Sequence, residues 1–168
     1  MHTLYIGGIP LTDYNGTVNQ QYEPIGGDTL LRMASGKAKK RQHWQKWQTT
    51  ISGSGWLPLG LGSLDYSKPI EIACIKPMSI SSPSSRVFEL PGNRRLDVLP
   101  WGLALVEHEW FETAVTLDGN LATLDNVVGA RLYQVLWLPL LTVFMSNPTE
   151  QVNTTDASYD WTIEAQEE

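Results

Sequence analysis

The side chains that could support catalysis are few and widely separated in this sequence. Histidine occurs only at positions 2, 43 and 108, and none of the three has the His-Glu-x-x-His spacing that binds zinc. In an extended strand, Glu107 and Glu109 would point to the face opposite His108, because successive side chains alternate. Around Ser54, Ser52 replaces the first glycine of a Gly-x-Ser-x-Gly nucleophile turn. We therefore expect no enzymatic activity, no metal site and no bound cofactor.

The single cysteine and the apolar segments limit the redox and membrane chemistry that we expect. Cys74 has no second cysteine with which to form an internal disulfide, and its apolar surroundings at residues 69–75 indicate a small buried side chain. The first residues lack the basic start and apolar run of a signal peptide. The longest apolar run, residues 135–145, is too short to span a bilayer. We therefore expect no membrane partner.

A dense group of basic residues could bind either nucleic acid or an acidic protein surface. Six of the twelve basic residues lie within fifteen positions, interleaved with His43, Trp44 and Trp47. These six are Arg32, Lys37, Lys39, Lys40, Arg41 and Lys46. Single-strand binders use cations along the phosphates and rings against the bases. The net charge of −6 and the pI near 5.0 argue against that class, whose members are usually basic, so docking on protein is the favoured interpretation.

Charge is divided unevenly between the two parts of the chain. Residues 1–106 carry 11 basic and 7 acidic side chains, a net charge of +4, whereas residues 107–168 carry 1 basic and 11 acidic, a net charge of −10. Such an asymmetry suggests oppositely charged surfaces that pair between neighbouring subunits, or an acidic lining on one side of an assembly. A solvated acidic terminus explains the same numbers.

Turn residues and short apolar runs predict about eight strands and little helix, which indicates an all-β barrel or sandwich. The 168 residues suit a single domain, 1–168. Residues 29–33, a turn at 34–37 with Gly36, and residues 38–51 predict a β-hairpin. Both faces of its basic strand are polar, so we expect this hairpin to project from the barrel or to be covered by another subunit.

Three further segments are assigned from their composition. Residues 3–11 predict the first strand, with a bulge at Gly7–Gly8, and the polar residues 12–27 predict a connecting loop. The Ser- and Pro-rich residues 78–100 predict a long loop or arm with at most a short strand at 86–90. Residues 61–66 are the one place where a short helical turn is expected.

Several of these segments resemble a family of bacteriophage tail and baseplate structural proteins. The similar pieces are Leu30-Leu31-Arg32-Met33 with its turn, the basic strand with Trp44, Thr49-Thr50-Ile51-Ser52-Gly53-Ser54-Gly55-Trp56-Leu57-Pro58, Leu64-Asp65-Tyr66, and residues 159–168. They cover roughly the first half of the chain and its last ten residues. The resemblance implies a tail-tube-like β-barrel of the distal tail or tube-initiator type.

The resemblance also implies a mechanical function. The chain would oligomerise into a ring of six copies, or of three, around the tail channel of the virion, and would join the tail tube to neighbouring baseplate proteins. Assembly would take place in the host cytoplasm, and DNA would only pass through the channel, which the acidic half of the chain could line. The alternative is a single-stranded nucleic-acid-binding β-barrel that uses the hairpin 32–47.

The residues that we predict to form the assembly interface are basic or aromatic. On the hairpin they are Arg32, Lys39, Lys40, Arg41, Trp44 and Trp47, and on the segment 78–100 they are Arg86, Arg94 and Arg95. Arginine and tryptophan are enriched among the residues that dominate binding energy at protein interfaces.

Overall fold

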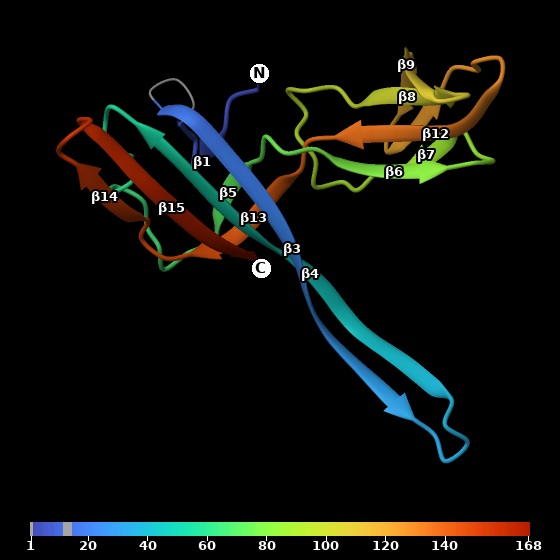
Figure 1. The fold of residues 1–168 in the computed structure, drawn as a ribbon, viewed down its shortest axis with the longest axis horizontal. Helices are drawn as coiled ribbons and strands as arrows, with labels where there is room; N and C mark the ends of the chain where they lie inside the picture. Colours follow the sequence, from blue (N-terminus) through green and yellow to red (C-terminus); the bar gives the residue numbers. More distant parts are fainter. Residues whose placement is uncertain (1, 12–14) are drawn as a thin grey trace. The chain divides into compact units, whose positions relative to one another are not determined.

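The computed structural model describes residues 2–11 and 15–168, and the fold is all-β, as the sequence predicts. No helix occurs in these residues, so the expected helical turn at 61–66 is absent. The strands are β1 (Tyr5–Ile6), β2 (Ile9–Pro10), β3 (Asn15–Arg32), β4 (Ala38–Gly55), β5 (Ile70–Ala73), β6 (Met78–Ser82), β7 (Val87–Glu89), β8 (Trp101–Val106), β9 (Glu109–Thr113), β10 (Val115–Asp118), β11 (Leu121–Leu124), β12 (Ala130–Trp137), β13 (Leu140–Met145), β14 (Thr149–Asn153) and β15 (Ser158–Glu167) (Figure 1).

The chain divides into two compact units. The first contains residues 3–72 and 142–168, and the second contains His2 with residues 73–141. Within the described residues, none of the sheets closes into a barrel, and the arrangement is sandwich-like. The single domain expected from chain length stays a prediction.

The first unit is built on one antiparallel sheet with the strand order β2-β1-β5-β13-β15-β4-β3, and β14 also pairs with β15. One face of this sheet is apolar because every second residue of β15 is buried, as is Ile51 of β4. The buried apolar side chains of this unit are Leu4, Ile6, Leu11, Ile51, Leu59, Leu61, Ile70, Ile72, Val143, Met145, Trp161, Ile163 and Ala165. The opposite face of β15 carries Asp160, Thr162, Glu164 and Gln166, all exposed.

The second unit is a small sandwich with its own core. The four-stranded sheet β6-β12-β8-β9 and the three-stranded sheet β10-β11-β7 supply its layers. Their shared core consists of Phe88, Leu90, Ala104, Ala122, Leu124, Tyr133, Val135 and Trp137. A hairpin turn follows Asp118, with Gly119 at a φ of +59° between β10 and β11.

Three of the local predictions are wrong. Residues 15–27, expected in a loop, belong to the long strand β3, whereas residues 12–14 lie outside the described part. Gly7 and Gly8 have φ values of +55° and +82° and form a turn between β1 and β2 instead of a bulge. The segment 78–100 contains two strands, β6 and β7, which pair with β12 and β11. In residues 15–27 and 78–100, cross-strand pairing overrides a local preference for loop.

Candidate assembly interface

The outer half of the β3–β4 hairpin extends beyond the rest of its sheet. β15 pairs with β4 only from Gln48 to Gly55, whereas β3 pairs with β4 along its whole length as far as Ala38. Figure 1 shows the two strands continuing past the end of β15 as a narrow ribbon. We call residues 26–46 the basic arm. Its six cations and its single carboxylate, Asp28, give it a net charge of +5.

The basic arm is exposed on both faces. Residues 38–45 of β4 are all exposed, and so are residues 28–37. Four large apolar side chains share this exposure: Leu30 (60%), Leu31 (46%), Met33 (58%) and Trp44 (53%). A two-stranded ribbon that buries little apolar surface is at best marginally stable in water. The arm therefore has the composition of a segment that gains stability when a partner covers it.

A bulge changes which side chains share a face of the arm. Gly27 pairs with Trp44 and Asp28 pairs with Gln42, so His43 is the extra residue in β4. On one face the register places Asp28 and Arg32 with Lys40. On the other face it places Leu31 with Lys39 and Arg41. We call this second face, which carries Leu31, Lys39 and Arg41, the outer face of the arm.

The two faces differ in how their charges are paired. The Lys40 ammonium lies 2.7 Å from the Asp28 carboxylate. The hydrogen bond from Lys40, and then its charge, lower the pKa of Asp28 below the usual value of 3.8. No carboxylate of the described residues forms an ion pair with Lys39 or Arg41. The outer face therefore offers two cations without an acidic partner in the described part of the chain.

Trp44 of the arm and Trp47, which directly follows the arm, are held by different contacts. Trp44 lies over Gly27, where an added Cβ would come 2.7 Å from its Nε1. Trp47 is half-buried, its ring lies 6.3 Å from that of Tyr22, and its backbone N–H donates to Glu167 Oε2 over 3.0 Å. Trp44 thus remains half-exposed on the arm, and Trp47 anchors the base of the arm to β15.

The three predicted interface arginines of the second unit have internal partners. Arg86 is exposed and donates to the Leu124 carbonyl over 3.2 Å. Arg94 is 7% exposed and donates to Pro91 O, Gly119 O and Asn120 Oδ1. Its guanidinium therefore joins two loops of the second unit.

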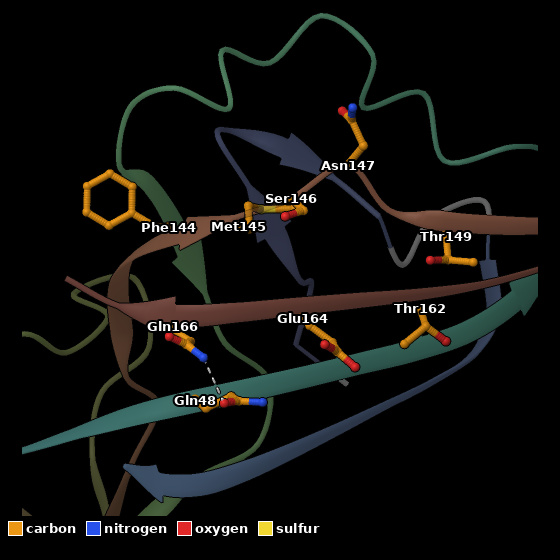
Figure 2. Close-up of a pocket in the computed structure, with 9 residues that line it drawn as sticks. All are labelled: Gln48, Phe144, Met145, Ser146, Asn147, Thr149, Thr162, Glu164 and Gln166. Atoms are coloured by element: carbon orange, nitrogen blue, oxygen red, sulfur yellow. Dashed lines mark hydrogen bonds between the residues drawn. The ribbon is translucent and has the colours of Figure 1, made fainter. Parts of the chain in front are cut away.

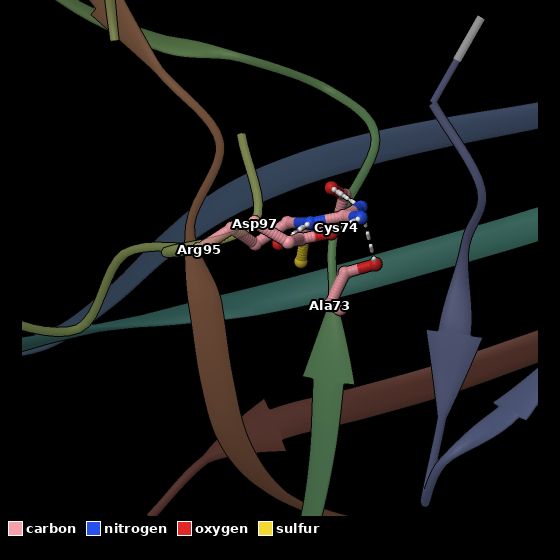
Figure 3. A network of polar contacts seen from close by, with 4 residues as sticks. All are labelled: Ala73, Cys74, Arg95 and Asp97. Carbon is pink, nitrogen blue, oxygen red and sulfur yellow. Dashed lines mark hydrogen bonds and ion pairs between the residues drawn. The ribbon is translucent and has the colours of Figure 1, made fainter. Parts of the chain in front are cut away.

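Arg95 is also buried, at 4% exposure. It forms an ion pair of 2.6 Å with Asp97 and donates to the carbonyls of Cys74 and Ala73 (Figure 3). The hydrogen bond from Arg95 is the main reason that the pKa of Asp97 lies below its usual value. Arg94 and Arg95 are buried, and their guanidinium groups bond to residues of the second unit. The candidate interface therefore consists of the hairpin residues.

A groove runs along the exposed face of β15 in the first unit. β13 pairs with β15 through Met145↔Ala165, and β14 pairs with it from Thr149↔Thr162 onwards. Between them the chain leaves the sheet at Ser146–Pro148, and neither β13 nor β14 has a residue paired with Glu164. The resulting groove of about 370 Å³ contains Phe144, Thr162, Glu164 and Gln166 (Figure 2). Figure 2 shows Glu164 projecting from β15 between Gln166 and Thr162.

A second groove continues the first along the same strand. It also has a volume of about 370 Å³, shares Thr149 and Thr162 with the first groove, and includes Asp160. We call the two grooves together the β15 trough. The six acidic residues of the segment 142–168 are accompanied by no lysine or arginine. The net negative charge of residues 107–168 predicts an acidic surface in this part of the chain. It does not indicate that β15 carries the acidic side chains.

Metal-binding side chains do not gather in the described residues. No cluster of three or more His, Cys, Asp or Glu side chains in residues 2–11 and 15–168 could hold a metal ion. His43 lies on the basic arm and His108 in the turn between β8 and β9. No helix in this part of the chain is long and apolar enough to cross a membrane. No protein-family model and no curated protein matches the chain.

Proposed function

We propose that the chain is a structural assembly subunit that binds copies of itself and neighbouring proteins through its basic arm. The observation that carries this proposal is the exposure of residues 28–45, which include four exposed apolar side chains, in an arm with a net charge of +5. The resemblance to phage tail and baseplate proteins supplies the context: a ring around the tail channel that connects the tube to baseplate components. In that context the chain has a structural role, and DNA only passes through the channel.

The size of the arm's apolar surface indicates how such an assembly would behave. Burying a large apolar side chain completely stabilises by about 1.5–3 kcal/mol. The four arm side chains are already partly covered, so one docked arm supplies only a few kcal/mol. Association costs about 4–15 kcal/mol in lost freedom. A single arm contact is therefore weak, and closed rings, in which every copy makes two contacts, are favoured over isolated dimers.

The same arm also supports a second candidate function, binding of single-stranded nucleic acid. Its cations and the half-exposed ring of Trp44 are the groups that such binders use. Against this candidate, Trp47 is half-buried beside Tyr22, and Trp44 is packed on Gly27. Few free ring faces remain for stacking, so we rank this function second.

The test is the mass of the purified chain at several concentrations, measured by light scattering and followed by negative-stain imaging. We expect rings or stacked rings for the natural sequence. The triple variant Lys39→Glu, Lys40→Glu, Arg41→Glu should stay folded and lose assembly. A control triple with the same change in charge, Lys68→Glu, Lys76→Glu, Arg131→Glu, alters exposed residues outside the arm and should assemble normally.

Two outcomes would contradict the proposal. Normal assembly by the arm variant would show that the arm is not the contact. A chain that stays monomeric and retards oligonucleotides, with an affinity that falls steeply with salt, would favour the second function.

A further inference from the structure

We infer that the receptor for the basic arm is the β15 trough of a second copy of this chain. The inference rests on the proposed assembly function and names the surface that the arm would bind. It starts from the charges of the first unit. Outside the arm, the residues of this unit include ten acidic side chains and one basic side chain, Lys68. A net charge of −9 thus stands beside an arm of +5 in the same unit.

The arm cannot reach the trough of its own chain. The trough follows residues 160–166 of β15, which pair with residues 48–54 of β4. The arm is the direct continuation of β4 in the direction away from that stretch (Figure 1). At about 3.3 Å per residue, Ala38 lies roughly 33 Å beyond Gln48. Folding back would break the β3–β4 ladder, so an arm–trough contact must join two copies.

The outer face of the arm matches the trough in chemistry. The arm presents Lys39 and Arg41, which have no acidic partner among the described residues, next to the half-exposed Leu31. The trough presents Asp160 and Glu164 next to Phe144, which is 47% exposed. Two cations two residues apart span about 7 Å and two carboxylates four residues apart about 13 Å. The long side chains of lysine and arginine take up this difference.

The arm–trough contact joins two different surfaces, and this determines the type of assembly. An arm that enters a trough is a heterologous contact, because two different surfaces meet, and such contacts repeat from copy to copy until they close a ring or extend a filament. A symmetric arm-to-arm contact would bring two segments of +5 together, which repulsion disfavours. The inference therefore predicts head-to-tail rings.

Charge exchange across the contact tests this directly. The arm variant Lys39→Glu, Arg41→Glu and the trough variant Asp160→Lys, Glu164→Lys change only exposed side chains. Each variant alone should remain folded, as judged by circular dichroism, and should need at least a tenfold higher protein concentration to assemble. The chain that carries all four substitutions should recover most of the lost assembly. A control, Glu109→Lys, Glu112→Lys, alters the exposed acidic residues of β9 beside Trp110 and Phe111 and should assemble normally.

Mixing the two defective variants gives a second readout. In the mixture, the intact arm of the trough variant can bind the intact trough of the arm variant, and the Glu-bearing arm of the arm variant can bind the Lys-bearing trough of the trough variant. We therefore expect a 1:1 mixture to form mixed rings at concentrations at which each variant alone stays monomeric. A mixture that stays monomeric at these concentrations would contradict the arm–trough contact.

The possible failures are distinguishable. If the arm variant loses assembly while the trough variant assembles normally, the inference is wrong and the proposed function stands. If only the β9 control loses assembly, the surface that binds the arm lies on β9, and the inference is wrong as well. If the arm variant itself assembles normally, both the proposed function and the inference fail. A natural sequence that is monomeric at every concentration also overturns the inference, which requires a second copy.

Discussion

The two halves of the β3–β4 hairpin share one ladder of backbone hydrogen bonds but lie in opposite environments. In the inner half, β15 adds a third strand, and Thr49 and Ile51 are completely buried. In the basic arm no third strand follows, and residues 38–45 are exposed on both faces. The backbone pairing is alike, so the difference in burial decides which half is stable by itself. The inner half belongs to the core, and the outer half is available for binding.

The largest expected difference between the halves comes from truncating an apolar side chain in each. Ile51→Ala should lower the free energy of unfolding by about 2–5 kcal/mol, because it removes a buried side chain and leaves a cavity. Leu30→Ala, on the arm, should change it by less than about 0.5 kcal/mol in the unassembled chain. Urea denaturation of both variants checks this. Equal losses would mean that the arm is packed against the protein in solution.

A smaller difference is expected for the glycines of the two halves. A Cβ at Gly53 would come 2.5 Å from the Trp161 ring and 2.8 Å from the Thr17 carbonyl. Gly53→Ala should therefore destabilise by about 1–3 kcal/mol, since the buried ring has little room to move.

A Cβ at Gly27 would instead meet Trp44, whose half-exposed ring can shift. Gly27→Ala should cost less than about 1 kcal/mol, and it should move the fluorescence of Trp44. The same denaturation measurement compares the two glycine variants. A larger loss at Gly27 would show that the arm is as rigidly packed as the inner half.

The ends of the arm were predictable because local signals agree with the tertiary structure there. The turn at 34–37 is found as expected: Gly36 has a φ of +80°, and the Met33 N–H donates to the Lys37 carbonyl over 3.0 Å. The polar faces of residues 38–45 also predicted an exposed hairpin. Both signals lie within a few residues of each other in sequence, which is the range that propensities describe.

The inner strand and the receptor surface were not predictable in the same way. Pro24, Gly26 and Gly27 argue locally for a loop, but β4 supplies a partner for the whole of residues 18–32. Arg94 and Arg95 are predicted from the sequence as interface cations, but their carbonyl partners come from loops up to 25 residues away. The trough depends on where β13 leaves β15 and β14 rejoins it. The strand, the two buried arginines and the trough all depend on contacts between segments that are distant in the sequence. The local pattern of polar and apolar residues does not predict such contacts.

The smallest expected effect separates the two faces of the arm by titration. The Lys40 ammonium lowers the pKa of Asp28 below 3.8. Because the folded pKa is depressed, the ion pair stabilises the arm above the unfolded pKa, and this stabilisation is lost as the pH falls through the folded value. A carbon-detected NMR titration of Asp28 should show its pKa rising toward 3.8 in Lys40→Gln and staying low in Lys39→Gln, whose side chain lies on the outer face. Added salt should reduce the shift, because both partners are more than half exposed. An equal response to both substitutions would mean that the register on the two sides of His43 does not separate the faces, and Lys39 would then no longer be free to bind the trough.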